Sequence, residues 1–428
     1  MRSSLAAFAL VLAMTSCGRS EPEFFAIHDA GPIDTYEPSP DTAIEVAADT
    51  AVCAWGGFAP AVTYGVCPSG DIQPTPIAVG DFNGDGHLDL ASLDFGNYAV
   101  AILINNGDGT FASYVSYAAG SAPRQLVAAD FDGDGRLDLA IADCLGSASN
   151  YQSTIAVLKG HGDGTFAAPV LAPTGGQCAE ALMVGDLNGD KHPDVATTNH
   201  NSNSLAILLN HGDGTFAAGV TYEAANPDSL ALADLDGNGT LDVIVSLRTA
   251  QSASFETFFN DGKGALTAGA TYAFGPTQSP ALESAGYLVT GDFHRIGRND
   301  LIVSDTVNNE LLLYSNPGNG VFGTPTTIPL DGLAGPLYAA DFNRDGLLDI
   351  ATSLLARPAD GGSVAISFAL MLGAASDTFS PPVTFGSPQA PNYVAAADFN
   401  GDGYPDMVVG DMSWVNVLLS QCAGDAGP

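Results

Sequence analysis

A nine-residue acidic loop returns seven times along this chain, and its spacing constrains the fold more than any other feature. The first copy reads DFNGDGHLD from Asp81 to Asp89. Consecutive copies start 48 to 58 residues apart, at Asp130, Asp186, Asp234, Asp292, Asp341 and Asp398. Repeats of this length are typical of propellers and solenoids, in which each copy forms one structural unit.

The second copy indicates which elements make up a unit. Between Gln125 and Thr174 the sequence predicts a strand (QLVAADF), the acidic turn, a second strand (LAIAD), a loop, a third strand (STIAVLKG), a hairpin turn (HGDG) and a fourth strand (TFAAPVLAPT). Four antiparallel strands form one propeller blade. The seven copies therefore predict an all-β fold, a seven-bladed β-propeller of four-stranded antiparallel blades.

The two ends of the repeat region complement each other. The last copy stops after its third strand, residues 414–420, and lacks a fourth. The missing piece stands before the first acidic loop, where WGGFAPAVTY from Trp55 to Tyr64 aligns with DGTFAAPVLA of the second copy. We therefore expect the N-terminal strand to complete the seventh blade and close the ring, which removes the open sheet edges of a linear array.

The cysteines suggest two disulfides. In register with the hairpin turns, Cys53 and Cys422 fall at neighbouring positions of one turn, so a bond between them would lock the seam of the ring. Cys144 and Cys178 are expected on one face and form the second suggested pair. Cys67 has no assigned partner, and buried free thiols remain the alternative for all of these cysteines.

The charge of the chain limits its partners. Asp and Glu number 48 against 12 Lys and Arg, a formal net charge of -36 to which the acidic loops contribute more than half. No cluster of basic residues is present that would attract nucleic acid or anionic lipid. We expect neither as a partner.

The N-terminus has the features of an export signal. Arg2 precedes an apolar run from Leu5 to Met14, which is too short for a stable membrane-spanning helix. The sequence Met14 to Cys17 resembles the lipobox of bacterial lipoproteins, in which the cysteine becomes the lipidated N-terminus. An ordinary secretory signal is the alternative.

These features predict four segments: a lipoprotein signal peptide at 1–17, a flexible acidic tether at 18–52, the propeller at 53–422 and a short tail at 423–428. The expected location is the outer membrane or cell surface, with membrane contact only through a lipid on Cys17. We expect a monomer.

The acidic loop has the donor pattern of a calcium site. Oxygen-bearing side chains stand at positions 1, 3, 5 and 9, the alternate spacing aims them inward, and the backbone carbonyl at position 7 would add a ligand. Several hard oxygens at adjustable distances favour Ca²⁺ over Mg²⁺, and the absence of cysteine ligands disfavours zinc and copper. An EF-hand is excluded, because Ser92 stands where its twelfth-position Glu would be and strands flank the loop.

Six loops keep the full pattern, so we predict about six bound calcium ions. Their predicted ligands, with position 7 contributing its carbonyl, are Asp81, Asn83, Asp85, His87 and Asp89; Asp130, Asp132, Asp134, Arg136 and Asp138; Asp186, Asn188, Asp190, His192 and Asp194; Asp234, Asp236, Asn238, Thr240 and Asp242; Asp341, Asn343, Asp345, Leu347 and Asp349; and Asp398, Asn400, Asp402, Tyr404 and Asp406. The fifth loop, DFHRIGRND, puts His294 and Ile296 at positions 3 and 5. We expect it to hold no calcium and Arg295 and Arg298 to replace the cation.

A second repeated element, GDGTF, begins at Gly107, Gly162 and Gly212. We interpret it as a hairpin turn followed by a packing phenylalanine. Separate ligand roles for its aspartates are disfavoured, and the histidines of the repeat turns are interpreted as structural.

The acidic loops, each leading into an apolar strand and followed by GDGTF, resemble the FG-GAP/VCBS repeat proteins, whose best-known fold is the seven-bladed propeller of integrin alpha subunits. The resemblance extends from about Cys53 to Cys422. It implies that the intact loops bind calcium and that the opposite face receives ligands.

Two functional classes remain open. The favoured one is a surface binding or adhesion module for a glycan or a protein, with no catalytic residues. The alternative is a carbohydrate-active enzyme similar to propeller-containing polysaccharide lyases, against which stand the lack of a visible nucleophilic triad pattern and the scarcity of basic residues. The loops between second and third strands offer candidate contacts at Tyr98, Tyr151, His200, Asn201, Asn308 and Trp414.

Overall fold

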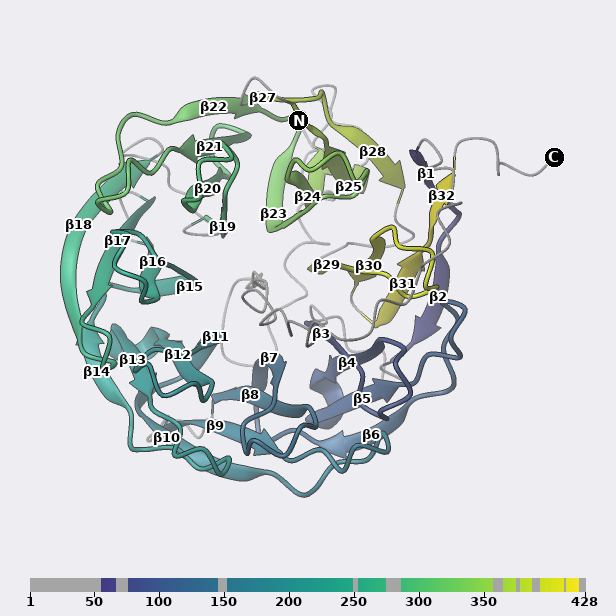
Figure 1. Ribbon diagram of the computed structural model, residues 1–428, viewed down its shortest axis with the longest axis horizontal. Coiled ribbons are helices and arrows are strands. Elements are labelled where there is room, and N and C mark those ends of the chain that lie inside the picture. The colour runs from purple at the N-terminus through teal and green to yellow at the C-terminus, as the bar shows by residue number, and fades with distance from the viewer. Residues whose placement is uncertain are drawn as a thin grey trace, which may run out of the picture.

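Seven four-stranded antiparallel sheets form a ring around a common centre (Figure 1). The computed structural model describes residues 55–66, 76–144, 152–248, 253–274, 286–356, 365–374, 378–386, 393–411 and 413–422. In each sheet the first strand lies nearest the centre and the fourth lies at the rim. The predicted all-β, seven-bladed propeller is confirmed.

The four strands of each blade follow one another from the centre to the rim. They are, in blade 1, β3 (Ile77–Gly80), β4 (Asp89–Asp94), β5 (Ala99–Leu103), β6 (Val115–Ala118); in blade 2, β7 (Pro123–Ala129), β8 (Asp138–Cys144), β9 (Gln152–Leu158), β10 (Val170–Gln177); in blade 3, β11 (Ala179–Gly185), β12 (Asp194–Asn199), β13 (Ser204–Leu208), β14 (Val220–Glu223); and in blade 4, β15 (Pro227–Ala233), β16 (Asp242–Arg248), β17 (Ala253–Asn260), β18 (Leu266–Phe274). The ring continues with blade 5, β19 (Leu288–Gly291), β20 (Asp300–Asp305), β21 (Glu310–Tyr314), β22 (Thr326–Pro329); blade 6, β23 (Leu333–Ala340), β24 (Asp349–Ala356), β25 (Ala365–Met371), β28 (Val383–Gly386); and blade 7, β29 (Tyr393–Ala397), β30 (Asp406–Gly410), β31 (Trp414–Leu418), β2 (Val62–Gly65).

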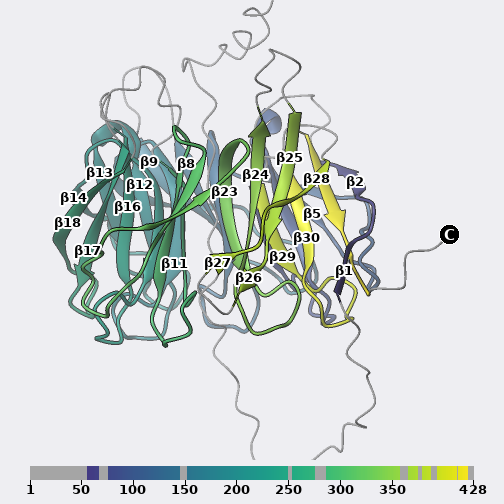
Figure 2. The ribbon, with the colours of Figure 1, turned by 90° about the horizontal axis from the view of Figure 1, so that it is seen from above.

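Two short two-stranded sheets and two 3₁₀ turns complete the described fold. The pairs β1 (Trp55–Phe58) with β32 (Ser420–Cys422) and β26 (Gly373–Ala374) with β27 (Thr378–Phe379) form two-stranded sheets. They lie at the same edge of the ring (Figure 2). Single 3₁₀ turns, η2 (Phe95–Asn97) and η3 (His200–Ser202), follow the second strands of blades 1 and 3. Among the described residues, no helix has the length and apolar character to cross a bilayer.

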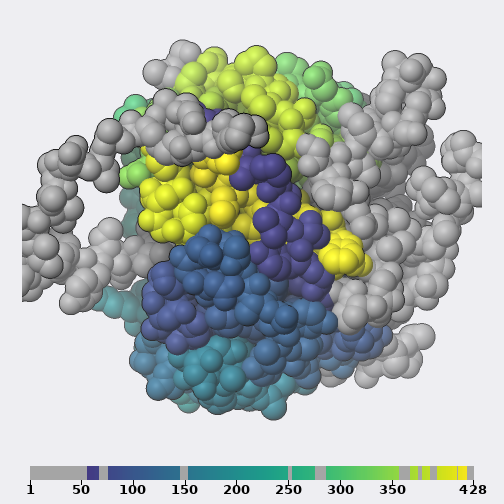
Figure 3. All heavy atoms as spheres, turned by 90° about the vertical axis from the view of Figure 1, so that its right-hand side faces the viewer, coloured from purple at the N-terminus to yellow at the C-terminus, as the bar shows by residue number. Residues whose placement is uncertain are grey.

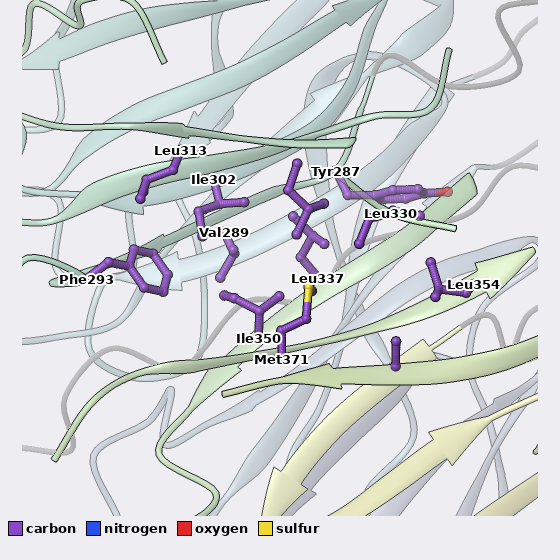
Figure 4. Close-up of a cluster of buried hydrophobic side chains, with 13 residues drawn as sticks. Tyr287, Val289, Phe293, Ile302, Leu313, Leu330, Leu337, Ile350, Leu354 and Met371 are labelled. Atoms are coloured by element: carbon purple, nitrogen blue, oxygen red, sulfur yellow. The ribbon is translucent and has the colours of Figure 1, made fainter. Parts of the chain in front are cut away.

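The middle strands of a blade are buried on both faces because they pack against the blades on either side. Every residue of β4, β8 and β12 is buried, whereas three of the four residues of the rim strand β6 are exposed. The apolar residues of neighbouring blades meet in continuous clusters, of which the one between blades 5 and 6 is drawn in Figure 4. Burial of these apolar surfaces is the main stabilising contribution to a fold of this type.

Aromatic pairs join consecutive blades. The phenylalanine at position 2 of an acidic loop meets the GDGTF phenylalanine of the next blade edge to face, with ring centroids 5.6 Å apart for Phe82 with Phe166 and for Phe131 with Phe216. Such pairs contribute about 1 kcal/mol beyond the area they bury. The packing role predicted for the GDGTF phenylalanine is confirmed, although the rim strand of blade 2 begins only at Val170, later than the sequence suggested.

The N-terminal strand closes the ring as predicted. β2 pairs with β31, with Val62 opposite Val417, and supplies the fourth strand of blade 7. Phe58 takes the place of a GDGTF phenylalanine, with its ring 6.0 Å from that of Phe342 in blade 6. Figure 3 shows the N-terminal strands in contact with the C-terminal ones at this seam.

One predicted disulfide is present, and the other involves a residue outside the described part of the chain. Cys144, the last residue of β8, is bonded to Cys178, which precedes β11, so the bond joins blades 2 and 3. Cys53 lies outside the described residues, although Trp55 two positions later pairs with Cys422. Cys17, the tether, Cys67, Tyr151 and the C-terminal tail also lie outside them.

Candidate metal centres

The seven acidic loops lie on one face of the ring, where each connects the first and second strands of its blade. Position 9 is in every case the first residue of the second strand, as Asp89 is of β4. The GDGTF hairpins connect third and fourth strands and therefore lie on the same face, because consecutive antiparallel connections alternate between the two faces. Acidic loops and hairpins thus meet at one edge of the propeller.

The aspartate at position 1 shapes the loop. Asp81 Oδ1 accepts hydrogen bonds from the backbone N–H groups of Gly84 at 2.7 Å and Asp85 at 3.2 Å, and Oδ2 accepts one from Gly86 at 2.9 Å. Gly84 and Gly86 have φ angles of 75° and 87°, a region that glycine adopts without steric cost. Asp130, Asp186, Asp234 and Asp398 accept the equivalent hydrogen bonds from positions 4 and 6, and Asp341 accepts those from positions 5 and 6.

The aspartate at position 9 is fully buried and anchors the loop to the blade. Asp89 Oδ2 accepts the N–H of Phe82 at 3.0 Å, and Oδ1 accepts that of Asn105 at 2.8 Å. Burial raises the pKa of Asp89 to about 6, and the charges of Asp85 and Asp81 contribute in the same direction. The equivalent pKa values are about 6 for Asp138, Asp194, Asp242 and Asp406, and about 7 for Asp349.

Positions 1, 3 and 9 converge. Carboxylate oxygens of Asp130, Asp132 and Asp138 all lie within 4.8 Å of one another, and so do those of Asp234, Asp236 and Asp242. Three like charges so close repel one another unless a cation lies among them. Oxygen donors at this separation suit Ca²⁺, so the residues present fit the ion that the sequence predicts.

Position 5 contacts position 3 in the loops with asparagine there. Asn83 Nδ2 donates to Asp85 Oδ2 at 2.8 Å, and the pairs at 188/190, 343/345 and 400/402 make the same contact. In the second loop Asp134 instead lies 3.4 Å from the Arg136 guanidinium. The structure therefore brings positions 1, 3 and 9 together in the second and fourth loops and joins positions 3 and 5 in four others, whereas the ligand roles of position 5 and of the position 7 carbonyl stay predictions.

The side chains at position 7 pack over the hairpin of their own blade. A Cβ added to Gly107 would lie 2.8 Å from His87 Nε2, and one added to Gly212 would lie 2.6 Å from His192 Nε2. Tyr404 is buried, with Arg344 5.1 Å above its ring. These contacts agree with a structural role for the histidines of the repeat turns.

The hairpins bind the acidic loop of the preceding blade. Asn210 Nδ2 donates to the Phe131 carbonyl at 2.8 Å, and the Gly214 N–H donates to the same oxygen at 2.9 Å. Asp213 is occupied within its own turn, where Oδ1 accepts both the N–H and the hydroxyl of Thr215. The conformation of an acidic loop is thereby coupled to the contact between two blades.

The fifth loop is organised differently. Asp292 still accepts the N–H groups of Ile296 and Gly297, at 2.8 Å each. The replacement of the cation by arginines stays a prediction; the guanidinium of Arg298 donates to the Pro317 carbonyl. The imidazole of His294 contacts the position 9 carboxylate instead, with Nδ1 2.6 Å from Asp300 Oδ2.

That histidine belongs to an arrangement that sequence reasoning missed. Ser315, just beyond β21, places its Oγ 3.1 Å from His294 Nε2. Ser315, His294 and Asp300 therefore form a hydrogen-bonded row. Ser315 and Asp300 stand 21 and 6 positions from His294 and belong to no recognised motif, so the only sequence signal was the replacement of the usual residue at position 3.

The candidate ligand contacts that belong to the described residues lie on the opposite face. Tyr98 is 51% exposed and Trp414 is 39% exposed, and they occupy the neighbouring blades 1 and 7. His200 is engaged with the Pro227 carbonyl at 3.1 Å, and Asn308, although exposed, donates to Asp305 at 2.8 Å. Tyr98 and Trp414 are therefore the candidates that combine an exposed position with a large aromatic face.

Comparison with known proteins agrees with the fold. The FG-GAP-like repeat family matches residues 81–141, 186–245, 292–352 and 354–409. Among curated proteins there is no match.

Two solved structures are similar to this chain. One is from work on the recognition of non-reducing terminal N-acetylglucosamine by an Agrocybe aegerita lectin, with a TM-score of 0.54 and 19% identity over 78% of this chain and 91% of that one. The other comes from the complex of BBS1N with ARL6DN, with a TM-score of 0.56 and 12% identity over 87% of this chain and 99% of that one. At these identities the likeness concerns the fold alone.

Proposed function

Because this chain belongs to the FG-GAP-like repeat family, we propose that it is a calcium-stabilised propeller that binds a glycan or a protein at the cell surface. The observation that carries the calcium part is the convergence of Asp130, Asp132 and Asp138 within 4.8 Å. A bound Ca²⁺ would neutralise these carboxylates and hold positions 1, 3, 5 and 9 together.

Calcium at the loops would act on the whole ring. The carbonyl of Phe131 in the second loop accepts hydrogen bonds from the hairpin of blade 3, so fixing this loop also fixes a contact between blades. The role proposed for the ion is therefore to keep the propeller rigid, which lowers the entropic cost of binding a ligand elsewhere on it.

The face opposite the loops is the proposed ligand surface. Exposed Tyr98 and Trp414 on adjacent blades offer aromatic faces with a polar edge, which suit contact with a sugar ring or a protein. A lectin of similar fold whose structural work concerns recognition of terminal N-acetylglucosamine lends support to a glycan. Fold similarity alone does not determine the ligand.

The location is part of the same proposal. The export signal and Cys17 would attach the protein to the outer membrane or cell surface by a lipid, with residues 18–52 as the tether. Metabolic labelling with an alkyne fatty acid tests this, because Cys17→Ser should abolish incorporation. Equal labelling of both forms would contradict the anchor.

A glycan array separates the functional classes. The mature protein is applied with calcium and after treatment with EDTA, beside Tyr98→Ala and Trp414→Ala variants. The binding proposal is supported if the wild-type protein retains intact sugars and this retention falls after EDTA treatment and in the Tyr98→Ala or the Trp414→Ala variant. Release of unsaturated sugars would instead favour a lyase.

Calcium itself is tested by stability. EDTA should lower the melting temperature of the wild-type protein by mass action, and Asp81→Ala should lower it further by leaving the N–H groups of Gly84 and Gly86 without their acceptor. If neither EDTA nor Asp81→Ala changed the melting temperature, the calcium assignment would be wrong.

A further inference from the structure

The fifth blade holds a row of three side chains that the proposed binding function does not use. Ser315 Oγ lies 3.1 Å from His294 Nε2, and His294 Nδ1 lies 2.6 Å from Asp300 Oδ2. A hydroxyl, an imidazole and a carboxylate in this order match a nucleophile, a general base and the group that orients the base.

The hydrogen bonds determine the tautomer of the histidine. Asp300 is fully buried, and its Oδ1 accepts the N–H of Asn316 at 2.8 Å while Oδ2 accepts from His294. A carboxylate oxygen accepts hydrogen bonds, so the 2.6 Å contact assigns the ring proton to Nδ1 and leaves Nε2 as the acceptor. The Ser315 hydroxyl therefore donates to Nε2, which is the direction needed for removal of its proton.

The serine is available to a substrate. Ser315 is exposed and the His294 side chain is 18% exposed, whereas the orienting Asp300 side chain is 0% exposed. A reacting molecule can thus reach the hydroxyl while the carboxylate stays protected from solvent.

The row arises from two changes in one copy of the repeat. The N–H that follows Ser315 binds the position 9 aspartate, as the N–H groups of Asn105, Gly160, Asn210, Asn260, Gly373 and Ser420 do in the other blades. The residues at the Ser315 position of those blades are Ile104, Lys159, Leu209, Phe259, Leu372 and Leu419. Serine stands there only in the copy that has histidine at position 3.

The fold places these two positions opposite each other. In blade 2 the corresponding residues are Lys159 and Asp132, whose charged groups are 3.1 Å apart. The geometry of the blade therefore brings these two positions together, and the fifth copy places a serine and a histidine at them.

A shallow apolar hollow lies between blades 5 and 6, and two of its lining residues are near the row in the chain. Phe293, Leu313, Leu348 and Phe379 help to line it. Phe293 precedes His294 directly, and Leu313 stands two residues before Ser315. Figure 4 shows Phe293 and Leu313 toward one end of the apolar cluster between blades 5 and 6.

We propose that Ser315, His294 and Asp300 form a serine hydrolase site for short-chain esters. Ser315 Oγ attacks the ester carbonyl carbon while its proton passes to His294 Nε2. The tetrahedral intermediate breaks its bond to the alcohol oxygen, which leaves with the proton from Nε2, and an acyl ester of Ser315 remains. Water then attacks this ester as Nε2 takes a proton, and release of the carboxylic acid restores the hydroxyl.

The surroundings fit this reaction class. Ser315 is exposed at the surface, so a small ester can reach its hydroxyl without a deep binding pocket. Arg298 donates to the carbonyl of Pro317, two residues beyond Ser315. The site needs no calcium and stands independently of the binding function.

Ester hydrolysis by the full-length mature protein tests the proposal, with p-nitrophenyl acetate as the substrate. Ser315→Ala should lower kcat/KM at least about a hundredfold, and His294→Gln should have a similar effect, because base and nucleophile act together. Ser116→Ala is the matched control, since Ser116 is exposed on β6 in another blade. It should leave the rate unchanged.

A fluorophosphonate probe gives a second readout that does not depend on turnover. Peptide mapping should locate the probe on Ser315 of the wild-type protein, and His294→Gln should suppress the labelling. Unchanged melting temperatures and circular dichroism show that the variants are folded. The proposal would be overturned if the wild type and Ser315→Ala hydrolysed the ester equally fast, or if the probe were found on residues other than Ser315.

Discussion

The stability of the calcium-free protein should rise when the pH is lowered from 7.5 to 5. The reason is the set of six buried carboxyls at position 9, of which Asp89 is the first. Burial raises the pKa of five of them from 3.8 to about 6, and that of Asp349 to about 7. Between pH 4 and 6 the folded protein therefore binds more protons than the unfolded chain.

The sign follows from linkage. Because the folded pKa is the higher one, the free energy of unfolding falls as the pH rises through about 6, and it recovers as the pH falls toward 4. A shift of two pKa units corresponds to about 3 kcal/mol for one group. With six such groups, the total change should reach several kcal/mol even if each contributes only a fraction of that value.

Calcium should remove this dependence. A cation among the carboxylates favours their ionised form, so the calcium-loaded protein should be more stable at pH 7.5 than the calcium-free one and should gain less from calcium at pH 5. Urea unfolding at pH 5, 6 and 7.5 measures both forms, with calcium removed beforehand by dialysis against EDTA.

A variant with one non-titrating group provides the control. Asp138→Asn keeps the size of the side chain and removes one of the six titrating groups, so it should reduce the pH dependence of the calcium-free protein by about a sixth, even if it lowers stability at every pH. A calcium-free wild type that loses stability steadily between pH 7.5 and 5 would refute the account of the buried carboxyls.

Three further predictions concern single features of the ring. His294→Asn combined with Ile296→Asp restores the ligand pattern of the fifth loop and should add one calcium ion in isothermal titration; an unchanged stoichiometry would contradict the importance of positions 3 and 5. Replacement of Cys144 and Cys178 by alanine removes a crosslink between residues 34 positions apart and should lower the free energy of unfolding by about 3 to 4 kcal/mol in the entropic treatment; no loss in urea unfolding would argue against that treatment. Phe58→Ala removes the ring that packs on blade 6 and should cost about 3 kcal/mol, with faster hydrogen exchange in β2 and β31; exchange that rises equally in all blades would show that the seam is not a local unit.

Hydrogen bonds between residues close in the chain explain why the fold could be predicted from the sequence. The side chain of Asp81 binds N–H groups three to five residues away, so contacts within the loop itself determine its conformation. Repetition of that loop revealed the number of blades, and the phase of Trp55 to Tyr64 against GDGTF revealed which strand closes the ring. The pairing of Val62 with Val417 confirms this closure, because the two residues come from opposite ends of the repeat region of the chain.

The candidate metal sites could be predicted from the sequence for the same reason, but the pKa values of their carboxyls could not. Spacing alone indicates that Asp130, Asp132 and Asp138 face one ion. The raised pKa of Asp138 depends on burial beneath the packed blades, which no nine-residue pattern contains. The contact of Asn210 with Phe131 likewise joins residues 79 positions apart in different blades.

The sequence by itself thus determined the repeat, the blade and the donor pattern of the loops, because these rest on contacts between residues near one another in the chain. Only the tertiary structure decided what the fifth copy became. His294 appeared in the sequence as a lost ligand, and the ring brought it between Asp300 and Ser315, at the ends of two different strands. Such a row depends on how strands lie side by side, and that placement is set by the packing of whole blades.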